Sequence, residues 1–119
     1  MRNEPTRIDP TQLEPVREFW ARPIGRHSAA LESVLSVLRS APVAGKHCLI
    51  CVLPHREWAL GRLSGVRGIP PARIDGPRFT SIDDAERYIF RLRWKAETGC
   101  TLPDDAELRA EVESKHVLF

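Results

Sequence analysis

The segment from Ser81 to Gly99 constrains the fold most, because it predicts one long helix with large apolar residues on opposite sides. Ser81-Ile82-Asp83-Asp84 forms a capping box, in which the serine oxygen and the Asp84 carboxylate satisfy backbone donors at the helix start. Gly99 stands where helices commonly end in a left-handed conformation. The rest of the chain must therefore supply cover for such a helix.

The two sides of this predicted helix suggest different roles. The side expected to cover a sheet carries Ala85, Tyr88, Ile89, Leu92 and Ala96. The opposite side carries Phe90 and Trp94, flanked by Arg87 and Arg91, and aromatic rings with arginine are typical of interface hot spots. We predict that these four residues face outward and bind a partner. The alternative is that the N-terminal arm or the C-terminal helix of the same chain covers the two rings.

The middle of the chain predicts a small antiparallel sheet. Residues His47 to Leu53 are apolar on both faces and end at Pro54, which is typical of a central strand. Residues Trp58 to Ser64 should pair with that strand as a hairpin. A short strand is predicted at Ala72 to Asp75, and Arg78 to Thr80 should return to the sheet.

Three further helices are indicated. Leu13, Val16, Phe19 and Trp20 share one helical face after Pro15. Ser28 is a candidate N-cap for a helix running to about Ser40, and a last, acidic helix should start near Asp104. The predicted class is α+β: a three-stranded antiparallel sheet, made of a hairpin plus a third strand, packed by the capped amphipathic helix, with an N-terminal and a C-terminal helix.

We predict an N-terminal arm over residues 1–22 and a single α+β domain over residues 23–119. An arm with two adjacent aromatic residues needs a surface to lie on, so Phe19 and Trp20 are also assigned to the partner interface. Trp58, at the start of the second predicted strand, completes this assignment.

The residues suggest no reaction centre. Cys48 and Cys51 have a metal-type spacing, but on a strand their thiols point to opposite faces, so we interpret both as core residues. The carboxylate pairs at Asp83-Asp84 and Asp104-Asp105 fall in first helical turns, where the helix dipole favours them. We therefore assign no catalytic, cofactor-binding or metal-binding residue to this chain.

Composition narrows the function classes further. The 119 residues are 42% hydrophobic and 29% charged, with no apolar run that could span a membrane or act as a secretory signal. Three cysteines cannot all pair, which favours reduced thiols and a cytoplasmic location. The net charge of +2 is too small to predict a nucleic-acid-binding protein by itself.

Several short motifs occur in a fixed order between roughly Pro23 and Glu97. They are Pro23-x-Gly25, Ser28-x-x-Leu31-x-x-Val34, Gly45-Lys46, Arg56-Glu57-Trp58 and Phe79-x-Ser81-x-Asp83-Asp84-Ala85. Together they resemble the small (alpha) subunit of bacterial N,N-dimethylformamidase. The resemblance implies a hetero-oligomer whose large subunit holds a mononuclear iron through tyrosine and carboxylate ligands. That subunit hydrolyses linear amides to an amine and formate, and the small subunit supplies none of the ligands.

Two functions follow from these observations. The first is a non-catalytic subunit that stabilises or orients a large, iron-containing amide hydrolase chain, with no cofactor of its own. The alternative is a DNA-binding module, because a three-stranded sheet followed by a capped helix also resembles the AP2-like arm domains of integrases. In that case the phosphate contacts would come from Arg56, Arg62, Arg67, Arg73 and Arg78.

Overall fold

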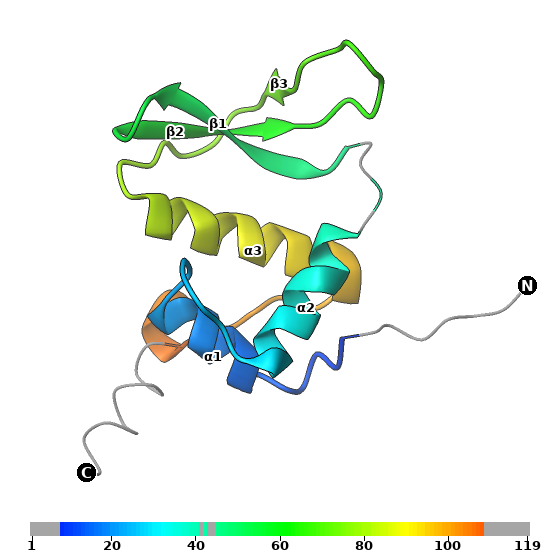
Figure 1. Ribbon diagram of the computed structural model, residues 1–119, viewed down its shortest axis with the longest axis vertical. Helices are drawn as coiled ribbons and strands as arrows, with labels where there is room; N and C mark the ends of the chain where they lie inside the picture. The colour runs from blue at the N-terminus through cyan, green and yellow to red at the C-terminus, as the bar shows by residue number, and fades with distance from the viewer. Residues whose placement is uncertain (1–7, 41, 43–44, 109–119) are drawn as a thin grey trace, which may run out of the picture. The chain divides into compact units, whose positions relative to one another are not determined.

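The computed structural model describes residues 8–40, 42 and 45–108, and it confirms the predicted α+β class (Figure 1). Residues 105–108 form a helical turn at the end of the described chain, whereas the rest of the predicted last helix lies outside it. The elements are α1 (Glu14–Ala21), α2 (Ala29–Arg39), β1 (His47–Leu53), β2 (Glu57–Arg62), β3 (Ala72–Arg73) and α3 (Ile82–Thr98).

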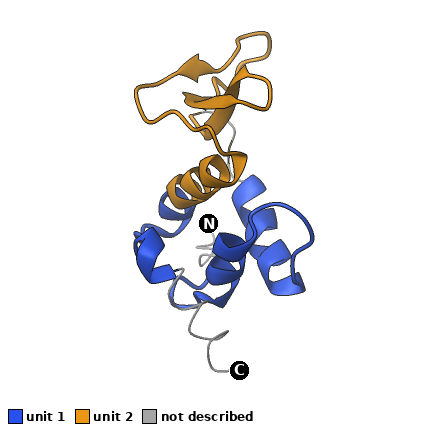
Figure 2. Ribbon diagram, turned by 90° about the vertical axis from the view of Figure 1, so that its left-hand side faces the viewer, with its two compact units in different colours: residues 1–40, 94–119 blue, residues 41–93 orange. Residues whose placement is uncertain are grey.

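The chain forms two compact units (Figure 2). Unit 1 comprises residues 1–40 and 94–119, and unit 2 comprises residues 41–93. Helix α3 contributes to both, because its residues up to Arg93 belong to unit 2 and those from Trp94 belong to unit 1. The predicted division into an arm over residues 1–22 and a domain over residues 23–119 stays a prediction.

In unit 1, helix α1 begins at the predicted place and buries the predicted face. Pro15 lies in its first turn, where a missing backbone N–H costs little. Val16, Phe19 and Trp20 are buried. The indole nitrogen of Trp20 donates to Oδ1 of Asp105 at 3.0 Å, which satisfies the polar atom of a buried ring. This bond connects α1 to the helical turn at residues 105–108.

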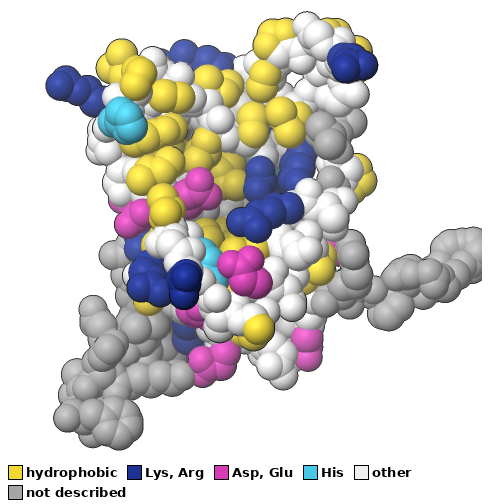
Figure 3. All heavy atoms as spheres, viewed as in Figure 1, with side chains coloured by type: hydrophobic (Ala, Val, Ile, Leu, Met, Phe, Trp, Pro, Cys, Tyr) yellow, Lys and Arg dark blue, Asp and Glu magenta, His cyan; other side chains and the backbone are white. Residues whose placement is uncertain are grey.

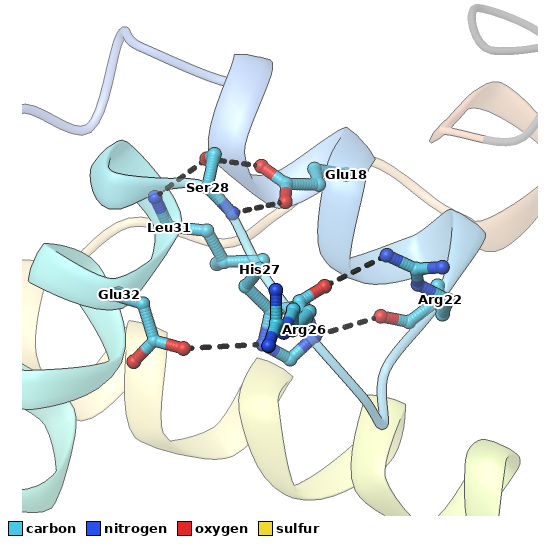
Figure 4. A network of polar contacts seen from close by, with 7 residues as sticks. All are labelled: Glu18, Arg22, Arg26, His27, Ser28, Leu31 and Glu32. Atoms are coloured by element: carbon cyan, nitrogen blue, oxygen red, sulfur yellow. Dashed lines mark hydrogen bonds and ion pairs between the residues drawn. The ribbon is translucent and has the colours of Figure 1, made fainter.

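The connection from α1 to α2 is fixed by polar contacts around Ser28 (Figure 4). As predicted, Ser28 caps α2: its hydroxyl oxygen accepts from the backbone N–H of Leu31 at 3.2 Å. The same hydroxyl donates to Oε1 of Glu18, and the backbone N–H of Ser28 donates to Oε2 of the same carboxylate. A single glutamate on α1 therefore holds the start of α2.

In unit 2, the sheet has the order β1-β2-β3, and both strand pairs are antiparallel. The predicted hairpin is confirmed. Its pairing runs from the pair His47–Arg62 to the pair Cys51–Trp58, and the register is irregular between Cys51 and Leu53. Strand β3 is shorter than predicted. The predicted return to the sheet is confirmed by a bridge between Trp58 and Phe79.

The ends of α3 agree with the capping signals in the sequence. The hydroxyl of Ser81 accepts from the backbone N–H of Asp84 at 3.3 Å, and the carbonyl of Ser81 accepts from the N–H of Ala85. At the other end, Gly99 has φ +76° and donates its N–H to the carbonyl of Lys95. Glycine adopts that backbone conformation without the steric penalty of a Cβ atom.

The register divides the strand residues between two faces of the sheet, since directly paired residues point to the same side. The inner face, toward α3, includes Trp58 and Phe79, and the Phe79 ring lies 5.3 Å from that of Tyr88 on the helix (Figure 1). We call the opposite side the outer face. It carries Cys48, Ile50, Leu53, Glu57, Ala59, Gly61, Arg73 and Arg78.

A glycine is needed at position 61, because the side chain of Ile50 and the backbone carbonyl of Ala72 both approach it closely. A Cβ atom there would lie 2.5 Å from Cδ1 of Ile50 and 3.1 Å from the carbonyl oxygen of Ala72. The first contact is shorter than van der Waals distance, so Ile50 would have to move. Ile50 therefore packs across the strand pair over a position without a side chain.

We expect Gly61→Ala to lower the free energy of unfolding by about 1–3 kcal/mol, because the added methyl group overpacks this site. In an Ile50→Ala background, Gly61→Ala should lower the free energy of unfolding by less, because Cδ1 and Cγ1 of Ile50, the two side-chain atoms closest to the added methyl group, are absent. Urea unfolding of the wild type, the two single variants and the double variant measures the coupling. Additive effects would contradict the packing described.

Candidate partner interface

The aromatic residues predicted to bind a partner are buried, so the expectation of an outward apolar patch on α3 is wrong. Phe90 is 2% exposed and Trp94 is 1% exposed within the single chain. Phe19 and Trp20 are buried as well. The physical reason is that large rings gain several kcal/mol on leaving water, and the chain itself supplies the cover. Which segment of the chain covers the two rings, the N-terminal arm or the C-terminal helix, stays a prediction.

The other three predicted interface residues lie in different settings. Arg87 donates to Oδ1 of Asp84 at 2.9 Å, one turn earlier on α3, and Arg91 is half-buried on the same helix. Trp58 is half-buried on the inner face of the sheet. The seven residues thus form no common exposed patch. Their contact with another chain stays a prediction, without the exposure on which it was based.

Removing either buried ring should destabilise the fold. We expect Phe90→Ala and Trp94→Ala each to lower the free energy of unfolding by about 3–5 kcal/mol, because each leaves a cavity. Thermal unfolding followed by circular dichroism measures this loss. Ile24→Ala is a matched control, since Ile24 is 50% exposed and should change stability little. Stable, fully folded Phe90 and Trp94 variants would contradict the burial.

The large apolar residues that are exposed lie elsewhere, three of them in unit 2. Leu53 ends β1 at 49% exposure, and Val66 and Ile69 are each 56% exposed in the connection from β2 to β3. That connection is held by Ser64, whose hydroxyl accepts from the N–H of Val66 at 2.9 Å and lies 3.1 Å from the Ile69 carbonyl. The sequence analysis did not assign Leu53, Val66 or Ile69 to an interface.

The outer face of the sheet is apolar along its middle and exposed at one end. Ala59 and Gly61 are buried at its centre, Cys48 and Ile50 are half-buried, and Leu53 is exposed at one end. Figure 3 shows apolar side chains exposed over the strands, with Lys and Arg side chains beside them. Within the described part of unit 2, α3 lies on the inner side only, and no other element covers the outer face (Figure 1).

The two neighbouring cysteines correct part of the sequence interpretation. Cys48 pairs with Gly61 and Cys51 pairs with Trp58, so they lie on opposite faces as a strand requires. Cys51 is exposed, however, so its assignment to the core is wrong, and Cys48 is half-buried. Burial raises the pKa of the Cys48 thiol, and the nearby charge of Arg93 opposes this shift.

Basic groups gather where β1 starts and β2 ends. Arg93 of α3 donates to the carbonyl of His47 at 3.0 Å, and a guanidinium nitrogen of Arg62 lies 3.4 Å from Nε2 of His47. Burial, followed by the charges of Arg62 and Arg93, lowers the pKa of His47. Burial and Arg93 also lower the pKa of Lys46. This corner of the sheet favours neutral histidine and would attract anionic groups.

The described residues bring no set of donors together for chemistry. Among residues 8–40, 42 and 45–108, no three His, Cys, Asp or Glu residues lie close enough to hold a metal ion. Helices in this part of the chain are all too short or too polar to span a bilayer.

The fold defines a small α+β protein with a capped helix on one side of a three-stranded antiparallel sheet. The family model for the N,N-dimethylformamidase alpha subunit matches residues 6–101, which is well over half of the chain. The chain therefore belongs to the N,N-dimethylformamidase alpha subunit family. No curated protein matches it.

Proposed function

We propose that this chain is the non-catalytic small subunit of a dimethylformamidase-like amide hydrolase, in which it stabilises or orients a large, iron-containing catalytic subunit. The family match over residues 6–101 carries the proposal, because an alpha subunit implies a multi-subunit enzyme. The assembled enzyme would hydrolyse linear amide C–N bonds, and the cytoplasm is its proposed location.

The side chains of this chain support a role in which it supplies no iron ligand. An iron site of tyrosine and carboxylates does not fit the described residues, because the sequence has one tyrosine, Tyr88. Its ring is half-buried and packs on Phe79 rather than beside a cluster of acids. We therefore assign the iron and the hydrolytic chemistry to the large subunit, and the burial of apolar surface to this one.

The arrangement of charge bears on the alternative of DNA binding. Of the five arginines proposed for phosphate contacts, Arg78 forms an ion pair with Glu57. The centre of the outer face, around Ile50 and Ala59, is apolar, whereas a sheet that reads DNA needs polar side chains toward the base edges. These observations favour a protein partner over nucleic acid.

Co-expression with the large catalytic chain of a dimethylformamidase-type enzyme tests the proposal. We expect the large chain alone to be inactive or aggregated, and addition of this chain to restore a hetero-oligomer and amide hydrolysis. Tyr88→Phe in this chain should leave the iron content and the kcat of the complex unchanged, because the hydroxyl serves no metal.

Two results would contradict the proposal. Full activity of the large chain by itself would remove the need for a small subunit. Loss of iron from a Tyr88→Phe complex that still assembles would place a ligand on this chain. Circular dichroism of the variant provides the control for folding.

A further inference from the structure

We propose that the outer face of the sheet is the surface on which the catalytic subunit docks, through the half-buried Ile50 and the exposed Leu53, with Arg73 at the border of this face. This inference rests on the proposed function and adds a location to it. The partner surface should carry an apolar patch beside at least one carboxylate.

The shape of the outer face suits close packing against another protein. Ala59 and Gly61 have little or no side chain, and Ile50 lies flat over Gly61, since a Cβ atom at Gly61 would lie only 2.5 Å from it. Leu53, which pairs with Glu57 after the irregularity in β1, extends the apolar surface at 49% exposure. Strand β1 is also an edge of the sheet, so it offers backbone groups beside this surface.

Charge on this face argues against a second copy of the same chain as the occupant. Among the described residues, the outer face of the strands carries one carboxylate, Glu57, which already binds Arg78. Arg73 pairs with Gly61 in the register and is exposed. A copy packed face to face would bring two such arginines into one interface without a free carboxylate for either. A different protein that carries acidic groups satisfies Arg73.

The most direct test compares exposed leucine and isoleucine residues that differ only in location. Leu53→Asp should weaken the complex with the co-expressed large chain by about tenfold or more, because it places a charge on the exposed apolar end of the outer face. Ile24→Asp, at 50% exposure in unit 1, is the matched control and should bind like the wild type. Arg73→Glu should also weaken binding, whereas Arg26→Glu, an exposed arginine of unit 1, should not.

The natural cysteines provide a second measurement that needs no variant. Cys48 lies on the outer face and Cys100 is exposed in unit 1. In the isolated wild-type chain both thiols should react with iodoacetamide, Cys48 more slowly because it is half-buried and has a raised pKa. In the complex, the labelling rate of Cys48 should fall about tenfold and that of Cys100 should stay unchanged.

The outcomes separate this inference from the function on which it rests. If the wild-type chains form no complex, the proposed function fails. If they form a complex that Leu53→Asp and Arg73→Glu leave intact, or that protects Cys100 but not Cys48, the docking surface is wrong and the function stands. Self-association of the isolated chain that Leu53→Asp abolishes, or binding to a DNA duplex at low salt that Arg73→Glu abolishes, would also overturn the assignment to a catalytic subunit.

Discussion

The rest of the structure depends on the burial of α3 on two opposite sides. At about 100° per residue, Ala85 and Trp94 lie half a turn apart around the helix axis, and both are essentially inaccessible to solvent. A helix with this pattern cannot stay at the surface of a domain. Within unit 2 the sheet covers one side of this helix, and Phe90 and Trp94 on its other side are buried as well.

This constraint also determines which surface remains for a partner. Because the chain itself shelters the rings of α3, no aromatic patch is left on that helix. Within the described part of unit 2, the sheet has a helix on its inner side only, and its outer face carries the half-buried Ile50 and, at one end, the exposed Leu53. For a member of a subunit family, an apolar face with an exposed positive border is consistent with a function carried out through association.

Local signals in the sequence predicted most of the fold. Ser28, Ser81 and Gly99 marked helix ends correctly because a cap depends on residues within one turn. The limits of β1 were predicted from its apolar run and from Pro54. The burial of Phe90 and Trp94 was not predicted, because it depends on residues distant in sequence. Likewise, the face on which Ile50 and Cys51 lie follows from strand register, which the sequence did not specify.

Hydrogen–deuterium exchange of this chain, alone and in complex with the catalytic chain, tests the central claim most directly. The account predicts added protection in the peptide covering residues 47–53, where an edge strand borders the docking surface. It predicts little change over residues 82–98, since α3 is already covered. Protection confined to the helix, with residues 47–53 unchanged, would contradict it.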